Sequence, residues 1–459
     1  RDPEMSRGLG DVYKRQSMNG KRRLKMKQLT RLFIPICLET LFYMLSGMVD
    51  TLMLSAVGDY AVGAVGTANS YIGIFIIMFS IISSGMVSVM TQNIGAGRPG
   101  VAYQARQLGL LFNAVAGVLM AVFLFSGAGA ILRMVGIADA LYEPALIYLK
   151  IVGGGCILNA VIPIFSSYLR AFGYTKQPLY ATIVGNIANF VMNAVFLFVL
   201  HKGVAGVAAA TVISKILNLC IVLYFSHKLI SAKNSTERIA NKTVLGQIVK
   251  VGLPSACETA LYNVAMMLVI RFLNQMDAEG LNVTARSYTA TISNFSYCVG
   301  AALAQANAIM TGWHIGAGEL EECDRGTKRA AFVGVCVAVC METAIVLGSG
   351  FIMPLFTDNP EMTALVRKLL AIDIVLEIGR VTNLVFGQAL KTSGDAVFPA
   401  VIAAVFMFVF AVGGTWLFGI SMGLMAVGAY IGLASDECVR AVGMVWRWKT
   451  GKWRTKKLV

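Results

Sequence analysis

The chain has 459 residues, of which 57% are hydrophobic and only 14% are charged, and its mean hydropathy is +0.70. A soluble globular protein carries about 25% charged residues, so the composition excludes that class and indicates an integral membrane protein. The net charge of +15 would suit a nucleic-acid-binding protein. The basic residues, however, gather in short stretches between apolar runs, so we expect lipid as the surroundings and no nucleic-acid partner.

The first segment, residues 1–28, precedes every apolar run. Residues 1–16 resemble translated adaptor sequence, so we expect the natural chain to begin near Met18 and exclude the leader from fold reasoning. The rest of this segment is predicted to be a basic cytoplasmic N-terminus, with the first span serving as the membrane-targeting segment.

Apolar runs long enough to span a bilayer then follow one another along the chain. We predict twelve spans, at about residues 29–55, 61–93, 104–127, 144–169, 178–200, 204–226, 244–272, 283–311, 327–350, 364–391, 396–418 and 422–446. A backbone exposed to lipid must satisfy its own hydrogen bonds, so we expect an all-α integral membrane protein. The predicted domains are an N-terminal lobe at 29–230, a cytoplasmic linker at 231–243, a C-terminal lobe at 244–447 and a basic cytoplasmic tail at 448–459.

The loops between spans alternate in charge. Basic residues crowd before the first span, after the last span and in every second loop, and the intervening loops carry few, with Arg133 and Lys202 as the main exceptions. This positive-inside pattern predicts that both termini are cytoplasmic, in a multi-pass protein of the plasma (inner) membrane.

The chain also contains an internal repeat. Residues 35–43 (PICLETLFY) return 219 positions later as residues 254–262 (PSACETALY), and residues 94–97 (IGAG) return 221 positions later as residues 315–318. The offset holds over nearly two hundred residues, because Gly173 matches Gly394 and Gly203 matches Gly423. An even number of spans per half predicts two homologous six-helix bundles related by a pseudo-two-fold axis along the membrane normal.

Motifs for cofactor or metal chemistry are missing. No Gly-x4-Gly-Lys-Ser/Thr sequence occurs, and residues 95–100 (GAGRPG) follow a span and not a strand, so they predict a cytoplasmic turn and no dinucleotide site. The nine cysteines and three histidines have no metal-ligand spacing. We therefore expect no catalytic residues, no enzyme activity, no metal and no cofactor, with an ion gradient of H+ or Na+ as the energy source.

The first predicted span carries two acidic residues, Glu39 and Asp50, which are eleven positions apart and so share one helix face. A carboxylate at bilayer depth costs about 2.5–3.5 kcal/mol on insertion scales, so each needs a partner or a function. In the second half Glu258 matches Glu39, but Val269 stands where Asp50 would be. This asymmetry makes Asp50 the candidate for a dedicated cation site.

Two other spans carry polar groups at helical spacing. Asn186, Asn189 and Asn193 form a stripe on the fifth span. Hydrogen bonding between helices is the favoured role for Asn186, whereas ion binding stays equally open for the other two. In the tenth span Asp373, Glu377 and Arg380 share a face and form either a structural ion cluster or a second protonatable site. The candidate second acidic or substrate site comprises Glu39, Tyr43, Glu258, Tyr262, Asp373, Glu377 and Arg380.

The sequence indicates less specific roles for the other charged residues within the spans. Arg286 could pair with Glu258, and Glu342 has no evident partner. Four more charges are more typical of structural roles: Lys215, Asp436, Glu437 and Arg440.

With these features, residues 29–447 resemble the multidrug and toxic compound extrusion (MATE) family of cation-coupled efflux transporters. The resemblance is carried by the two homologous halves and by the joint order of short segments: residues 47–51 (GMVDT), 95–97 (GAG), 170–173 (RAFG) ahead of Pro178, and 203–211 (GVAGVAAAT).

The resemblance implies a cation-coupling site at Asp50, Asn189, Asn193 and Thr211. Some members have an Asp where this chain has Asn193, so Asp50 is left as the main titrating group and a Na+ ion there becomes less favoured. Many members also have a seventh-span Glu where this chain has Tyr262, and Glu258 would have to substitute for it from a neighbouring turn.

The resemblance further implies a secondary antiporter, expected to be a monomer, that exports amphipathic, cationic drugs or toxic metabolites in exchange for H+ or Na+ by alternating access. The alternative is a lipid-linked oligosaccharide flippase of the same superfamily. Such flippases carry more cationic residues in the central cavity, whereas the membrane charges here lean acidic. An intramembrane enzyme would need clustered catalytic residues at one membrane face, which the sequence does not show.

Overall fold

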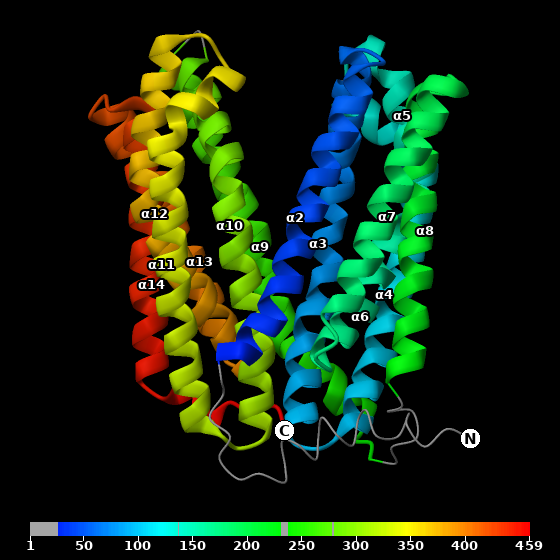
Figure 1. Cartoon of the computed structure of the whole chain (residues 1–459), viewed down its shortest axis with the longest axis vertical. Coiled ribbons are helices and arrows are strands. Elements are labelled where there is room, and N and C mark those ends of the chain that lie inside the picture. Colours follow the sequence, from blue (N-terminus) through cyan, green and yellow to red (C-terminus); the bar gives the residue numbers. More distant parts are fainter. Residues whose placement is uncertain (1–25, 136, 231–236, 278–279) are drawn as a thin grey trace. The chain divides into compact units, whose positions relative to one another are not determined.

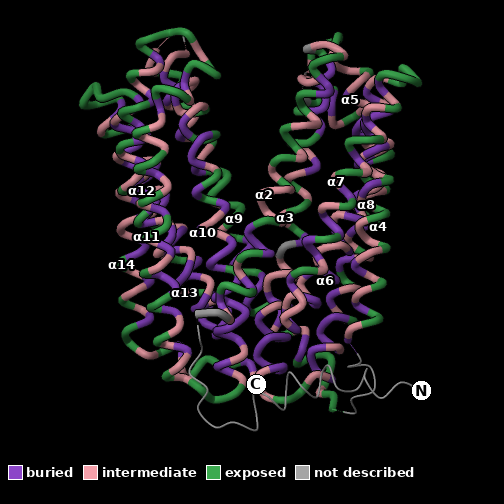
Figure 2. Tube along the Cα trace, viewed as in Figure 1, coloured by how far each residue is buried: buried purple, intermediate pink, exposed green. Residues whose placement is uncertain are grey.

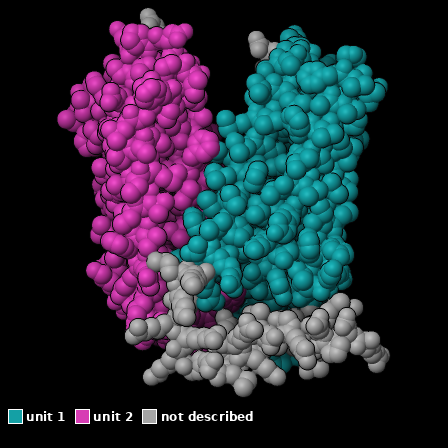
Figure 3. All heavy atoms as spheres, viewed as in Figure 1, with its two compact units in different colours: residues 1–252 teal, residues 253–459 magenta. Residues whose placement is uncertain are grey.

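The computed structural model describes residues 26–135, 137–230, 237–277 and 280–459. Over these ranges the chain is almost entirely helical and shows no strand. It divides into two compact units, residues 1–252 and 253–459 (Figure 3). Most of the predicted leader and residues 231–236 of the predicted linker lie outside the described residues.

The helices of unit 1 follow the predicted spans (Figure 1). They are α2 (Met26–Ser55), α3 (Asp59–Gly95), α4 (Pro99–Val135), α5 (Asp139–Gly154), α6 (Cys156–Ala171), α7 (Lys176–Ala194) with the π-helical turn η1 (Val195–Val199), and α8 (Gly203–Leu229). The pair α5 and α6 replaces one predicted span and is bent by 41° at Gly155. The next helix, α9 (Asn241–Met276), begins in unit 1 and continues into unit 2.

Unit 2 repeats this order of elements. Its helices are α10 (Leu281–Gly316), α11 (Leu320–Ile352), the 3-10 turn η3 (Met353–Leu355), α12 (Pro360–Ser393), α13 (Val397–Phe406) continued by the π-helical η4 (Met407–Val412) and η5 (Thr415–Ser421), α14 (Met425–Lys449) and the 3-10 turn η6 (Lys452–Thr455). Asp277 caps α10, because its carboxylate accepts from the backbone N–H groups of Leu281 (2.9 Å) and Asn282 (3.0 Å).

The repeat is visible in the backbone itself. Gly97 and Gly318 both have left-handed φ, 77° and 76°, and both end a helix; Gly173 and Gly394 do the same at 86° and 97°. These positions favour glycine because a Cβ atom is strained in that conformation. The short repeats found in the sequence are therefore equivalent helix ends in the two halves.

The described helices account for twelve membrane spans. Eight are long and apolar enough to cross a bilayer, and the bent pair α5–α6 makes nine. The remaining three are the long helices α10, α12 and α14, which carry more polar side chains; α12 and α14 contain the charged groups already noted. Every predicted span falls on one of these helices, so the chain is an all-α, multi-pass membrane protein.

Each unit has its own apolar core (Figure 2). In unit 1 it includes Leu124, Ala128 and Leu132 of α4, all fully buried. In unit 2 it includes Val269, the residue at the position equivalent to Asp50. At this position the second half therefore has a buried apolar side chain, whereas the first half has a carboxylate.

Two glycines bring the start of α9 against α3 within unit 1. A Cβ atom on Gly252 would lie 1.7 Å from the backbone oxygen of Ile81, and one on Gly85 would lie 1.9 Å from that of Ile248. No side chain fits at these distances, so glycine at both positions permits the close approach of the two backbones.

Candidate functional site

In unit 1, polar side chains of α2 and α7 meet at Asp50. The Asn193 amide nitrogen donates to Asp50 Oδ1 at 2.7 Å and to Asn189 Oδ1 at 3.1 Å. The Asn193 amide oxygen is buried and has no hydrogen-bond partner among the described residues. An aspartate held beside an unpaired amide oxygen is a suitable place for a proton or a small cation.

Helices α5, α6 and α8 complete this site. Lys215 donates to Asn159 Oδ1 at 2.8 Å and is close enough to interact electrostatically with Asp50. Thr211 donates to the Val207 carbonyl within α8 at 2.9 Å and lies beside the Tyr148 hydroxyl. We call this group the unit 1 polar centre: Asp50, Tyr148, Asn159, Asn189, Asn193, Thr211 and Lys215.

The sequence does not indicate three members of the unit 1 polar centre. Lys215 is expected to be structural, although its ammonium group is near enough to Asp50 to interact with it electrostatically. Nothing in the sequence marks Tyr148 or Asn159 as part of a functional site, because a single tyrosine or asparagine within an apolar span is commonly a packing residue. Tyr148 lies on α5 and Asn159 on α6, the two helices that meet at the 41° bend.

Asn186, one turn from Asn189, has a structural role. Its amide donates to the Phe42 carbonyl of α2 at 2.8 Å, which is the hydrogen bond between helices that the sequence favoured. This bond ties α7 to α2 about two helical turns from Asp50 and does not contact the carboxylate.

Glu39 and Glu258, both assigned to the candidate second site, each have a basic partner within their own unit. The Glu39 carboxylate forms an ion pair with Arg170 at 2.6 Å within unit 1, and Glu258 pairs with Lys391 at 2.7 Å within unit 2. The two acids are 219 positions apart and the two bases 221, so one ion pair occurs in each repeat. Because each carboxylate has its own basic partner, both are better explained as links between helices.

Arg286 does not pair with Glu258; its guanidinium instead reaches Met266 Sδ at 3.8 Å. Tyr43 is 71% exposed, and its assignment to the candidate second site stays a prediction. Tyr262 is 41% exposed and lies near enough to Arg380 to interact electrostatically with it.

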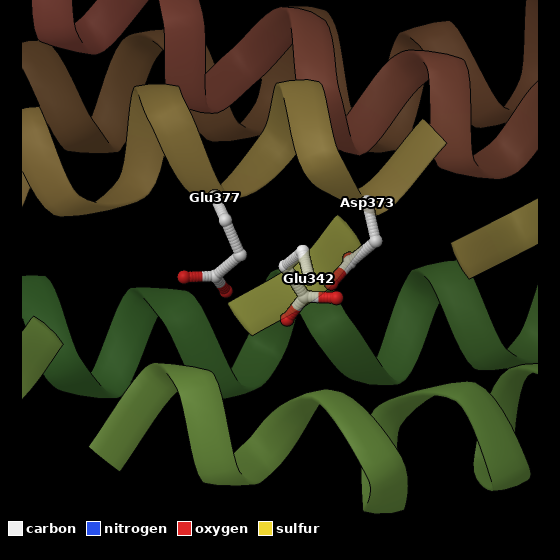
Figure 4. A group of neighbouring side chains, drawn as sticks. All are labelled: Glu342, Asp373 and Glu377. Carbon is white, nitrogen blue, oxygen red and sulfur yellow. The ribbon is translucent and has the colours of Figure 1, made fainter. Parts of the chain in front are cut away.

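Unit 2 contains a cluster of carboxylates on α11 and α12. Glu342, Asp373 and Glu377 each place a carboxylate oxygen within 4.8 Å of the others, and all three side chains are buried (Figure 4). We call them the acidic triad. Arg380 forms an ion pair with Glu377 one turn along α12. The structure thus assembles Asp373, Glu377 and Arg380 as the sequence spacing indicated, and adds Glu342 from the neighbouring helix.

The adjacent ion network on α14 is fully paired. Arg440 bonds Asp436 and Glu437, each at 2.7 Å, and the Asn383 amide donates to Glu437 at 3.0 Å. Arg380 also approaches Glu437 at 3.8 Å. Since each acid of α14 has a basic partner, these residues fit the structural role expected of them.

The negative charges of the acidic triad, in contrast, are not all paired with basic side chains. Two unit charges 4.8 Å apart repel by about 3–4 kcal/mol at an effective dielectric constant near 20. Arg380 offsets the charge of Glu377, but no ion pair of the described residues reaches Glu342 or Asp373. The triad can therefore persist only with protons or a cation bound to it.

An open groove runs along α2 and α3 of unit 1. Its lining residues are mostly apolar or small: Met44, Gly47, Met48, Thr51, Leu52, Ser55 and Val62. Asp50 belongs to the same helix but faces α7 rather than this groove. Methionine side chains adapt to ligands of different shape, so the groove suits an apolar molecule.

Sequence comparison links these features to known transporters. The MatE family model matches residues 35–195 and 254–417, once in each repeat. The uncharacterized transporter YisQ of Bacillus subtilis (strain 168) is 32% identical over 428 residues, covering 92% of this chain and 94% of that protein. The probable multidrug resistance protein NorM of Thermotoga maritima is 20% identical over 446 residues, covering 94% of each chain.

Solved structures share the fold. An outward-facing MATE multidrug resistance transporter of the MOP superfamily superimposes with a TM-score of 0.81 at 21% identity, over 93% of this chain and 96% of that one. A MOP superfamily transporter from Pyrococcus furiosus also gives 0.81, at 20% identity over 99% and 100% of the two chains. The family match covers both halves of a twelve-span fold. This chain therefore belongs to the MatE family of multidrug and toxic compound extrusion transporters, and it is a transporter rather than an enzyme.

Proposed function

We propose that this transporter is a proton-coupled antiporter that exports amphipathic, cationic small molecules by alternating access. It would act as a monomer in the plasma (inner) membrane, with both termini in the cytoplasm, as the distribution of basic residues favours. The observation that carries the proposal is the placement of Asp50, which accepts a hydrogen bond from Asn193 and lies near enough to Lys215 to interact with its positive charge.

The charges of the unit 1 polar centre favour H+ over Na+. Asp50 is its one carboxylate, and Lys215 already supplies a positive charge nearby. A Na+ ion would have to bind against that charge, whereas a proton neutralises Asp50 by forming a covalent O–H bond. Na+ coupling stays the alternative that the test below separates.

Protonation of Asp50 would act on the packing of α2 and α7. A neutral carboxyl group weakens the charge-assisted hydrogen bond from Asn193 and leaves Lys215 without its opposite charge. The helices that carry these groups then favour a different arrangement, which is how an ion can shift a transporter between two states. Exchange of one proton for one monovalent cation moves no net charge, so the pH gradient drives it, and each pH unit supplies about 1.4 kcal/mol, or tenfold accumulation of substrate.

The substrate class follows from the surface next to this centre. The groove along α2 and α3 offers methionine, leucine and valine side chains together with two hydroxyl groups. It suits the apolar part of an amphipathic molecule, and the Asp50 carboxylate on the same helix favours a positive charge on that molecule.

Export of ethidium from an efflux-deficient bacterium tests the proposal. Cells that express the native chain should retain less dye than cells that express Asp50→Asn at equal membrane abundance, and a protonophore should abolish the difference. Export that survives the protonophore but requires Na+ would replace the proposed ion. If no dye moves although the protein reaches the membrane, an exporter of narrow specificity or the lipid-linked oligosaccharide flippase becomes the better account.

A further inference from the structure

The segment that follows α14 folds back onto unit 2. Trp448, Trp453 and Leu458 recur every five residues and have at most 3% of their surface exposed. The rings of Trp448 and Trp453 stack with their centroids 4.2 Å apart, and the Trp453 indole N–H donates to the Trp448 carbonyl at 3.0 Å. We call residues 448–459 the basic strap. Three large buried side chains hold it in one place on the protein.

Polar contacts fix the basic strap to the ends of two other helices (Figure 1). At the start of α11, Asp324 accepts from the Trp448 indole N–H at 2.7 Å, and Glu321 forms an ion pair with Arg454 at 2.7 Å. At the end of α12, a side chain on Gly394 would overlap the backbone of the strap. The strap therefore crosses the ends of α11, α12 and α14.

The lysines of the basic strap point away from these anchors. Lys449, Lys452, Lys456 and Lys457 are all exposed, and no acid of the described residues pairs with any of them. No Asp or Glu follows Glu437 in the sequence. Four like charges on one short, fixed segment repel one another, so an anionic partner would stabilise it.

The outer face of α14 shows where the first of these lysines lies relative to the membrane. Val442, Trp446 and Lys449 are spaced by four and three residues, so they share one face, and all three are exposed. In a membrane helix an apolar residue faces the hydrocarbon, tryptophan favours the interface, and lysine extends to the headgroups. This order places Lys449 at the level of the lipid phosphates.

Lys449 lines a polar pocket of about 470 Å³ together with Lys328 of α11 and Arg454 of the strap. Sites for small molecules commonly have about 300–1,000 Å³. Asp324 also lines the pocket, but its two oxygens already accept from Trp448 and Lys328, each at 2.7 Å. The ion pairs of Lys328 and Arg454 lie at the surface, where such pairs are weak and can rearrange around a ligand. The pocket therefore suits a phosphate group.

Two general roles of basic residues explain only part of this arrangement. A lysine in the last turn of a helix complements the helix dipole, which applies to Lys449 but not to Lys452, Lys456 or Lys457 beyond that turn. The positive-inside rule requires basic residues near the end of a span, but not a segment fixed by buried tryptophans. The fixed strap and the pocket need a further explanation.

We propose that the basic strap and its pocket bind the headgroup of an anionic phospholipid, with the lipid phosphate among Lys328, Lys449 and Arg454. Clusters of four or more basic residues next to a membrane span are typical of segments that bind anionic lipids. The lipid would hold the ends of α11, α12 and α14 together through the strap. This site belongs to unit 2 alone and does not depend on proton coupling at Asp50.

Native mass spectrometry of the purified full chain in detergent tests this site, with phosphatidylglycerol as the anionic lipid and phosphatidylcholine as the neutral one. Phosphatidylglycerol should bind saturably and at least tenfold more tightly. The double variant Lys449→Gln with Lys452→Gln should lower its affinity by about twentyfold, because each basic residue near an anionic surface contributes about fivefold. Binding of phosphatidylcholine should not change.

Matched variants separate the site from general charge effects. Lys368→Gln removes an exposed lysine of α12 that is 26 positions before Gly394, about 39 Å along the helix, and should bind phosphatidylglycerol as the native chain does. Trp453→Ala keeps every lysine but removes an anchor, so it should bind more weakly, whereas Trp453→Phe should bind nearly as the native chain does. Asp50→Asn should lose dye export and keep lipid binding, so the two proposals fail separately.

Three results would overturn the proposal. The first is equal affinity of the native chain for the two lipids, and the second is native affinity in the double lysine variant. The third is displacement of phosphatidylglycerol by an equal concentration of inorganic phosphate, which would identify a site for soluble phosphate and not for lipid.

Discussion

At the scale of single residues, the unit 1 polar centre divides the polar stripe of α7 into two roles. Asn193 donates to the Asp50 carboxylate, and Asn186 donates to a backbone carbonyl of α2. The same residue type on the same helix thus bonds the carboxylate of the proposed coupling site at one position and a backbone carbonyl at another. This contrast allows the two roles to be separated by matched substitutions.

Asn193→Ala should reduce ethidium export by about tenfold or more, because a hydrogen bond to a charged group contributes about 1.5–3 kcal/mol. Asn186→Ala removes an equivalent amide that bonds a neutral carbonyl, so it should lower thermal stability slightly and leave export near the native rate. Export and thermal unfolding of both variants are measured side by side. Equal loss of export in the two variants would contradict the assignment.

Lys215→Met tests the reason for preferring H+. Without the ammonium group, Asp50 becomes the only charge at the unit 1 polar centre, and Na+ should then compete with protons for it. We expect added Na+ to slow export by this variant several-fold, while the native chain and Lys215→Arg stay insensitive. A Lys215→Met variant as insensitive to Na+ as the native chain would remove the electrostatic argument.

At the scale of helices, close packing and ion pairs hold each unit together. The start of α9 touches α3 through glycine backbone, and α2 is joined to α6 by an ion pair that recurs between α9 and α12. These contacts are internal to their own units and lie outside the proposed coupling site. Changes there should therefore affect stability before they affect coupling.

Gly252→Ala should destabilise the protein by about 1–3 kcal/mol or more, since the added methyl group would overlap the Ile81 carbonyl and force α9 away from α3. Gly246→Ala is the control on the same helix, because a Cβ there has nothing within 4 Å. It should be neutral or slightly stabilising. Thermal unfolding in detergent measures both, and equal melting temperatures would show that the close contact is absent.

Arg170→Met should destabilise unit 1 by about 2–3 kcal/mol, because it leaves the mostly buried Glu39 carboxylate without its partner. The double variant Glu39→Gln with Arg170→Met removes both charges and should recover most of that loss. Chemical or thermal unfolding of the two variants decides this. A double variant less stable than Arg170→Met would show that Glu39 has another role.

At the scale of the whole molecule, the duplication explains both what the sequence predicted and what it missed. The spans, the all-α fold and the equivalent helix ends followed from apolar length and from matching glycines such as Gly97 and Gly318, since both are local properties. The pairing of Glu39 with Arg170 did not, although both residues were noted, because it joins helices 131 positions apart. Sequence offset alone does not say which side chains face each other.

The unit 1 polar centre and the acidic triad also show that the sequence does not reveal which residues of different helices meet. Asp373, Glu377 and Arg380 could be predicted because they share a face of one helix, whereas Glu342 joins them from another helix and so carried no local signal. Lys215 was expected to be structural for the same reason. The repeats differ at these positions: the unit 1 polar centre has one carboxylate with a lysine near it, and the acidic triad of unit 2 has three carboxylates at positions where unit 1 has apolar or neutral residues.

Coupling of ethidium movement to proton movement in proteoliposomes tests the central claim most directly. Vesicles that contain the purified chain are loaded with acid and diluted into neutral buffer, and a pH-sensitive dye records the gradient. Ethidium added to native vesicles should speed loss of the gradient, and vesicles with Asp50→Asn should not respond. Equal responses from the native chain and from Asp50→Asn would contradict proton coupling at Asp50.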